Sequence, residues 1–118
     1  MALILIAEDE DVTRDLVRRA LETDGHEVAV AGDGREALDL AEKQAYDLIV
    51  TDVDMPNMDG VALAEALIKR NPRQRIILMS AIADELSRAR VMLGGHVRIM
   101  TKPLTLDAIR GEANELLG

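Results

Sequence analysis

The sequence predicts an α/β fold of the (βα)5 type, in which five parallel strands form one doubly wound sheet with helices on both faces. Short runs of apolar, β-branched residues alternate with longer stretches of helical spacing from end to end. Several of the short runs are continuously apolar, as in strands that are covered on both faces. With 118 residues and 48% hydrophobic composition, the chain can bury one core, so we expect a single domain over residues 1–118.

The predicted strands are short, and turn-forming pairs such as Asp24-Gly25 and Asn71-Pro72 separate them from neighbouring segments. Right-handed crossovers between successive strands would give an open parallel sheet. The five candidates are residues 2–7, 26–31, 47–51, 75–79 and 97–101.

Two segments carry apolar stripes at helical spacing and are expected to be amphipathic helices. The stripes are Val12, Leu16, Val17, Ala20 and Leu21 near the beginning, and Leu106, Ile109, Ala113, Leu116 and Leu117 near the end. Further helices are expected over residues 34–43, 61–70 and 84–93.

Composition narrows the classes of function. Cysteine is absent, which rules out disulfides and thiolate metal sites and fits a reducing compartment. The net charge of -8, with Tyr46 as the one aromatic residue, argues against a nucleic-acid partner. The apolar run at residues 2–7 meets four acids at residues 8–11, far short of a membrane span, so we expect a soluble cytoplasmic protein that does not bind membranes.

Polar residues follow four of the predicted strands. Glu8 and Asp9 follow the first strand, Asp52 the third, Ser80 the fourth and Lys102 the fifth. Open parallel sheets place their sites beyond the carboxyl ends of the strands, so these side chains are expected to gather at one edge.

The chemistry of this group suggests a cation and phosphoryl transfer. Carboxylates of Glu8, Asp9, Asp52 and Asp54 in one crevice would require a counterion, and oxygen-only ligands favour Mg²⁺ or Mn²⁺. With the cation and Lys102 as electrostatic clamps, an oxygen of Asp52 could attack a phosphoryl group and form an acyl phosphate. The hydroxyl of Ser80 could donate to a phosphoryl oxygen.

Each of these residues also has an ordinary structural explanation. Lys102 could be an exposed lysine before a turn proline, Ser80 could cap a following helix, and Asp59 could cap the helix that begins near Val61. Their joint placement at four separate strand ends favours a site.

At these residues the sequence resembles the CheY-like receiver domains of bacterial two-component response regulators, of the stand-alone type. The resemblance covers essentially the whole chain and implies a flavodoxin-like sheet with strand order 2-1-3-4-5. It rests on four segments: Leu5-Ile6-Ala7-Glu8-Asp9, Asp52-Val53-Asp54-Met55-Pro56-Asn57-Met58-Asp59-Gly60, Met79-Ser80-Ala81 and Lys102-Pro103.

The resemblance implies a role for each metal-site residue. Asp52 matches the phosphoacceptor, Asp9 a direct Mg²⁺ ligand and Glu8 an acid that acts through water. Asp54 lies where the family lends a backbone carbonyl to the metal.

The family resemblance also implies roles for Ser80 and Lys102, a phosphoryl donor and an output. Ser80 matches the Ser/Thr that closes on the phosphoryl group, and Lys102 the lysine that pairs with it, with a cis bond to Pro103. The implied donor is a histidine kinase or a histidine phosphotransfer protein, and the output is binding to a downstream protein by a monomer or a phosphorylation-dependent dimer. Such a domain would be a signalling module with only intrinsic self-phosphorylation and self-dephosphorylation, rather than an enzyme.

Several positions depart from the family's pattern. Ile99 stands where receivers usually carry the Tyr or Phe that swings inward on activation, so an aromatic switch is excluded. Leu104 replaces the common Phe after the Lys-Pro pair. The side chains of Asp54 and Ile82 are expected to flank the approach of the hydrolytic water and to tune the phosphoryl lifetime.

Two other functions remain open. Asp52-Val53-Asp54 is also the Asp-x-Asp pattern of haloacid-dehalogenase-like phosphatases, although that motif normally follows the first strand. A degenerate receiver that serves only as a binding scaffold is the second alternative. We expect no effector domain after the last helix.

Overall fold

The computed structural model describes residues 1–82, 87 and 96–118, and it confirms the predicted sheet. Five parallel strands are ordered β2-β1-β3-β4-β5. They are β1 (Leu3–Ala7), β2 (Glu27–Ala31), β3 (Leu48–Asp52), β4 (Ile76–Ser80) and β5 (Val97–Thr101).

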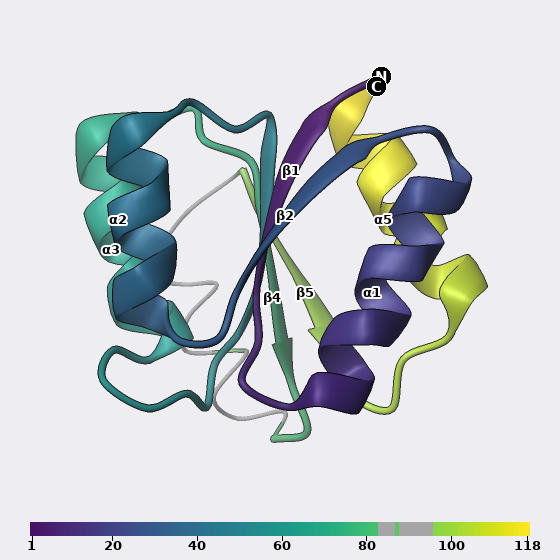
Figure 1. Ribbon diagram of the computed structural model, residues 1–118, viewed down its shortest axis with the longest axis horizontal. Coiled ribbons are helices and arrows are strands. Elements are labelled where there is room, and N and C mark those ends of the chain that lie inside the picture. Colours follow the sequence, from purple (N-terminus) through teal and green to yellow (C-terminus); the bar gives the residue numbers. More distant parts are fainter. Residues whose placement is uncertain (83–86, 88–95) are drawn as a thin grey trace.

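Within the described residues, four helices cover the sheet, two on each face (Figure 1). They are α1 (Asp11–Thr23), α2 (Gly34–Lys43), α3 (Gly60–Arg70) and α5 (Leu106–Leu117). α1 and α5 lie side by side on one face, and α2 and α3 on the other. The helix expected over residues 84–93 falls, apart from Ser87, outside the described residues.

The alternation of side chains along each strand divides the core into two layers. In β1, Leu5 and Ala7 point to the layer beneath α2 and α3, whereas Ile4 and Ile6 point to the layer beneath α1 and α5. Both layers are aliphatic apart from Tyr46, as the composition predicts. The central strands β1, β3 and β4 are thus buried on both faces, which explains their continuous apolar runs.

The strand boundaries differ from the predicted ones by one residue in four strands. β1 and β2 begin one residue later than predicted, and β3 and β4 are displaced by one residue toward their carboxyl ends. Asp52 and Ser80 are therefore the last residues of strands, where ladder pairing to Met79 and Thr101 holds their backbones. Among the described residues, no helix is long and apolar enough to span a membrane.

Candidate functional site

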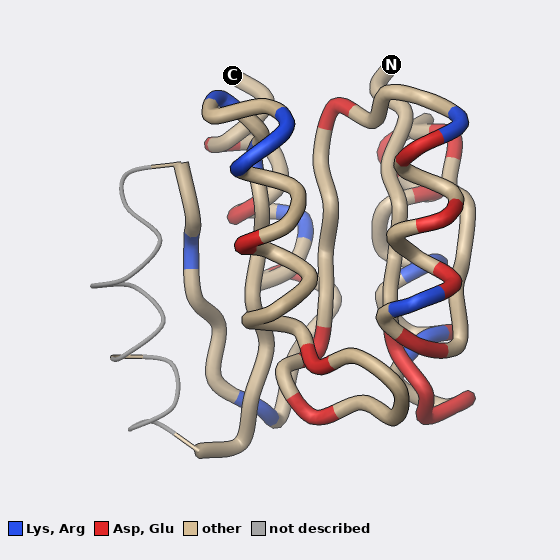
Figure 2. Tube along the Cα trace, turned by 90° about the vertical axis from the view of Figure 1, so that its left-hand side faces the viewer, with Lys and Arg blue, Asp and Glu red and all other residues tan. Residues whose placement is uncertain are grey.

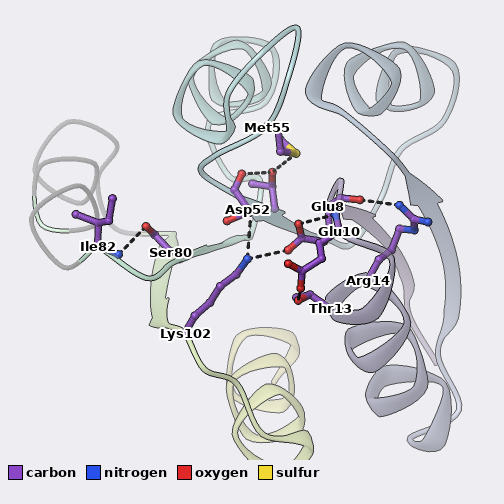
Figure 3. Close-up of polar contacts among 10 residues, drawn as sticks. Glu8, Glu10, Thr13, Arg14, Asp52, Met55, Ser80, Ile82 and Lys102 are labelled. Carbon is purple, nitrogen blue, oxygen red and sulfur yellow. Dashed lines mark hydrogen bonds and ion pairs between the residues drawn. The ribbon is translucent and has the colours of Figure 1, made fainter.

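Lys102 links two carboxylates that lie at the ends of different strands, at the carboxyl edge of the sheet (Figure 3). Its Nζ lies 3.0 Å from Oε1 of Glu8 and 3.2 Å from Oδ2 of Asp52. Glu8 follows β1, Asp52 ends β3 and Lys102 follows β5, so the three charges meet only because parallel strands end at one edge. The sheet therefore brings these three of the predicted residues together.

Three carboxylates are close enough to share one cation. Glu8, Asp9 and Asp52 each offer an oxygen, and these oxygens all lie within 4.8 Å of one another. Glu8 and Asp52 are buried whereas Asp9 is exposed, so the group opens toward solvent on one side. A set of carboxylate oxygens at an open edge suits Mg²⁺, which retains several waters and accepts one or two carboxylates.

Burial disfavours the charged form of the Glu8 carboxyl. In the metal-free protein, burial raises the pKa of the Glu8 carboxyl to about 7, against the opposing effect of its hydrogen bond with Lys102. The negative charge of Asp52 raises it further. For Lys102, burial alone would lower the pKa, but the hydrogen bond with Glu8 and the charges of Glu8 and Asp52 outweigh it and raise the pKa. The site therefore holds more carboxylate than one lysine neutralises.

Ser80 lies at the end of β4, with its side chain almost fully buried. Its Oγ accepts a hydrogen bond from the backbone N–H of Ile82 at 3.0 Å, and its carbonyl accepts one from the N–H of Lys102 at 2.9 Å. The Lys102–Pro103 peptide bond is cis, which confirms the expectation from the family resemblance. The chain after β5 is thus tied to the end of β4.

Asp54 lies apart from the carboxylate group. Its side chain is exposed, and it is not among the described acids whose oxygens come within 4.8 Å of one another. Only its backbone carbonyl, as the resemblance implies, remains a candidate ligand. Asp59 caps α3 by accepting a hydrogen bond from the N–H of Ala62 at 2.8 Å, which confirms its structural role.

The loop after β3 is held by contacts that sequence reasoning missed. A β-carbon on Gly60 would lie 2.0 Å from the carbonyl oxygen of Asp52, and one on Gly34 would lie 2.0 Å from that of Met58. Asn57 adopts a φ of 68° and donates from Nδ2 to Oδ2 of Asp33 at 3.0 Å. In the sequence, both glycines follow an aspartate, in Asp33-Gly34 and Asp59-Gly60, and this dipeptide is typical of turns but does not predict a close backbone contact.

Fold and site together define a parallel α/β domain with a carboxylate and lysine site at the switch between β1 and β3. A family model described as the response regulator receiver domain matches residues 4–114. The chain belongs to this family. This membership favours a receiver over a haloacid-dehalogenase-like phosphatase.

Solved structures agree with this membership. The chemotaxis response regulator CheY4 of Vibrio cholerae aligns with a TM-score of 0.89 and 28% identity, covering 98% of each chain. The receiver domain of the Francisella response regulator 1452 aligns with a TM-score of 0.88 and 30% identity, covering 99% of this chain and 97% of that one.

Curated relatives are longer proteins. The sensor protein EvgS of Escherichia coli is 39% identical over 113 residues, which are 96% of this chain but 9% of EvgS. The transcriptional activator protein PfeR of Pseudomonas aeruginosa is 32% identical over 97% of this chain and 37% of its own length. The chain therefore corresponds to one module of such relatives, and it is homologous to receivers of both kinases and regulators in two-component signalling.

Proposed function

We propose that Asp52 accepts a phosphoryl group from a phosphohistidine donor, with Mg²⁺ held by Glu8, Asp9, Asp52 and the backbone carbonyl of Asp54. The observation that carries the proposal is the position of Asp52, a buried carboxylate that ends β3 within 3.2 Å of Lys102 and within reach of two further carboxylates. Such a carboxylate is a nucleophile held beside the charges that phosphoryl transfer needs.

In the transfer, a carboxylate oxygen of Asp52 forms a bond to phosphorus while the bond from phosphorus to the imidazole nitrogen of the donor breaks. The electron pair of that bond stays on the nitrogen, which takes up a proton. Lys102 then pairs with the transferred phosphoryl group in place of the carboxylate, and the hydroxyl of Ser80 donates to a phosphoryl oxygen. When bound, Mg²⁺ supplies charge neutralisation at the phosphoryl oxygens.

The donor in this proposal is a histidine kinase or a histidine phosphotransfer protein, and the output is altered binding to a downstream protein. The absence of cysteine fits a reducing compartment, so the proposed location is the cytoplasm. The domain is proposed to act as a phosphoacceptor module whose own chemistry is limited to self-phosphorylation and self-dephosphorylation.

The test is intact mass spectrometry after incubation with Mg²⁺ and acetyl phosphate. We expect wild-type protein to gain one phosphoryl group that is stable in acid and lost in base. Asp52→Asn should gain none, whereas the matched control Asp39→Asn, which changes an acid on α2, should be labelled like wild type. Labelling of Asp52→Asn would refute the assignment, and no labelling of wild type would favour a degenerate receiver.

A further inference from the structure

Within the described residues, most of the lysines and arginines that have no ion pair lie at one corner of the domain. Twelve of the 14 lysines and arginines lie in the described residues, and seven of them form ion pairs. The other five have no ion pair within the described part of the chain, and four of these five lie where α2 and α3 end and where the chain turns into β4. They are Lys43, Lys69, Arg73 and Arg75, whereas Arg35 stands alone at the opposite end.

This arrangement is unexpected in a chain of net charge -8. Figure 2 shows basic segments at the end of α3 and in the turn after it, at the opposite end of the domain from the acidic loop that follows β1. We call Lys43, Lys69, Arg70, Arg73 and Arg75 the basic corner. Their side chains are exposed, so the corner presents its charge to solvent.

Two adjoining hollows give the basic corner a shape that could hold a ligand. Lys43 and Arg70 line a hollow of about 300 Å³, and Arg73 and Arg75, together with His96, line a second hollow of about 730 Å³. The two hollows share a wall formed by Ala45, Tyr46, Asn71 and Gln74. One extended ligand could therefore contact cations on both sides of that wall.

Among the described residues, two acids line these hollows, and both already have partners. Glu42 pairs with Arg70 at 3.7 Å, and Oδ2 of Asp47 accepts a hydrogen bond from the N–H of Leu3 at 2.8 Å. Neither acid pairs with Lys43, Arg73 or Arg75. The hollows consequently retain excess positive charge.

The base of the corner is rigid. Gln74 is buried, and its Nε2 donates to the carbonyl of Tyr46 at 3.1 Å and to that of Arg75 at 3.2 Å. The carbonyl of Arg75 also accepts a hydrogen bond from the N–H of Ile49 at 3.0 Å, in β3. The backbone that carries the cations is thus ordered before any ligand binds, which lowers the entropic cost of binding.

We propose that the basic corner docks an acidic segment, rich in Asp and Glu, of a partner protein. Carboxylates complement the unpaired guanidinium and ammonium groups and can bind arginine in a bidentate manner. Nucleic acid fits less well because the overall charge would repel it and because the one aromatic ring, Tyr46, is buried and cannot stack on a base.

The corner lies at the amino-terminal ends of the strands, and Asp52 lies at their carboxyl ends, about five residues or 15 Å away. A segment docked there leaves the carboxylate site open. The corner would therefore tether the receiver to its partner whether or not Asp52 is phosphorylated, and the test below does not depend on phosphorylation.

The probe is an oligoglutamate peptide, titrated into the full chain at low ionic strength. Tyr46 reports binding through its intrinsic fluorescence because it is the one aromatic residue and lies in the shared wall. Amide shifts in NMR spectra locate the binding site. Arg73→Glu and Arg75→Glu are compared with Arg35→Glu, which reverses another exposed arginine that has no ion pair with any described residue.

We expect the peptide to shift the amides of residues 43–47 and 70–75, and each corner variant to weaken binding about tenfold, against about twofold or less for Arg35→Glu. Binding should be equal for the unphosphorylated protein and the protein treated with beryllofluoride. Absence of peptide binding, equal losses in all three variants, tighter binding of a single-stranded oligodeoxynucleotide, or amide shifts that arise from self-association would each overturn the proposal.

Discussion

Gly60 packs directly against the backbone of Asp52. A β-carbon on Gly60 would lie 2.0 Å from the carbonyl oxygen of Asp52, and the N–H of Gly60 donates to the carbonyl of Val53 at 2.9 Å. The first residue of α3 therefore touches the carbonyl of the proposed phosphoacceptor. The packing of this helix onto the sheet therefore adds to the ladder pairing with Met79 in fixing the position of Asp52.

Gly60→Ala should destabilise the domain and disturb the site. The added methyl group meets backbone, which cannot rotate away, so α3 or the end of β3 must shift at a cost of about 1–3 kcal/mol or more. Urea unfolding measures the loss of stability. Because the shift is transmitted to Asp52, we also expect slower labelling by acetyl phosphate under conditions where the variant is still folded.

Gly111→Ala in α5 is the matched control. Apart from the chain neighbours and the backbone of α5 itself, no heavy atom of the described residues lies within 4 Å of the β-carbon that this substitution adds, and the residue is inside a helix. Alanine should therefore stabilise the domain by about 0.5–1 kcal/mol and leave labelling unchanged. If both variants lose the same stability, close packing at Gly60 is not the cause.

Gly60 is in close contact with backbone whereas Gly111 is not, and the sequence alone does not distinguish the two glycines. The strands and the gathering of Glu8, Asp52 and Lys102 at one edge were predictable because apolar runs and parallel connections have general geometric consequences. The contact of Gly60 with Asp52 depends on how closely a loop and a helix approach, which no local pattern encodes. Strand order came only with the family resemblance.

The basic corner could not be predicted from the sequence either, because it depends on contacts between distant residues. Lysines and arginines are spread along the sequence, and whether Arg73 or Arg110 has an acidic partner depends on residues that are far away in the chain. Ion pairing is a property of the folded surface. The net charge of -8 gives no sign of a basic surface.

Glu8 should make the metal-free protein less stable as the pH rises. Its pKa in the folded state, about 7, is above its ordinary value of 4.5. Its contribution to stability is therefore fully present below pH 4.5 and is lost as the pH rises through 7. Glu8→Gln should then be more stable than wild type at pH 8 in EDTA, by about 2 kcal/mol, and similar to wild type at pH 5.

Glu10→Gln provides the control, because it removes an exposed negative charge beside the site and leaves Glu8 in place, so it should not reproduce the gain in stability that Glu8→Gln shows at pH 8. Unfolding in urea at both pH values measures the effect. If Glu8→Gln is more stable than wild type by the same free energy of unfolding at pH 5 and pH 8, ionisation of Glu8 is not the cause of the difference.

Added Mg²⁺ should reverse this order of stability at pH 8. A cation bound by the carboxylates relieves their repulsion, so saturating Mg²⁺ should raise the midpoint of wild-type unfolding and raise that of Glu8→Gln much less. Calorimetric titration should show Mg²⁺ affinity falling below pH 7, by up to about tenfold per pH unit, as Glu8 becomes protonated. Affinity that is independent of pH would exclude Glu8 from the cation site.

The ion pair between Asp24 and Arg110 should stabilise the contact of α1 with α5. Nε and Nη2 of Arg110 lie 3.0 Å and 2.7 Å from Oδ1 of Asp24, and this hydrogen bonding holds the pKa of Asp24 below its ordinary 3.8. Its contribution is therefore present above pH 3.8 and is lost as the pH falls through the lower folded value. Arg110→Gln should lower the midpoint of thermal unfolding at pH 7, and the difference should shrink toward pH 3.

Arg98→Gln tests whether any arginine facing α5 has the same effect. Arg98 reaches Glu112 and Glu115 only through exposed contacts of 3.5 Å and 3.3 Å, which water and salt screen. We expect a smaller change in the midpoint at every pH. If both variants lower the midpoint of thermal unfolding equally, the ion pair with Asp24 contributes no more to stability than the exposed pairs of Arg98.

Phosphorylation should move the end of β4 without a ring rotation in β5. The hydroxyl of Ser80 accepts a hydrogen bond from the N–H of Ile82, and movement of this hydroxyl toward a phosphoryl group would break that bond. Ile99 is aliphatic and packs against the core layer beneath α2 and α3, so it cannot exchange a buried for an exposed ring. Beryllofluoride with Mg²⁺ should therefore shift the amides of Ser80, Ala81 and Ile82 strongly and those of Arg98, Ile99 and Met100 weakly. Asp52→Asn should show neither set of shifts, and larger shifts at Ile99 than at Ser80 would refute this route.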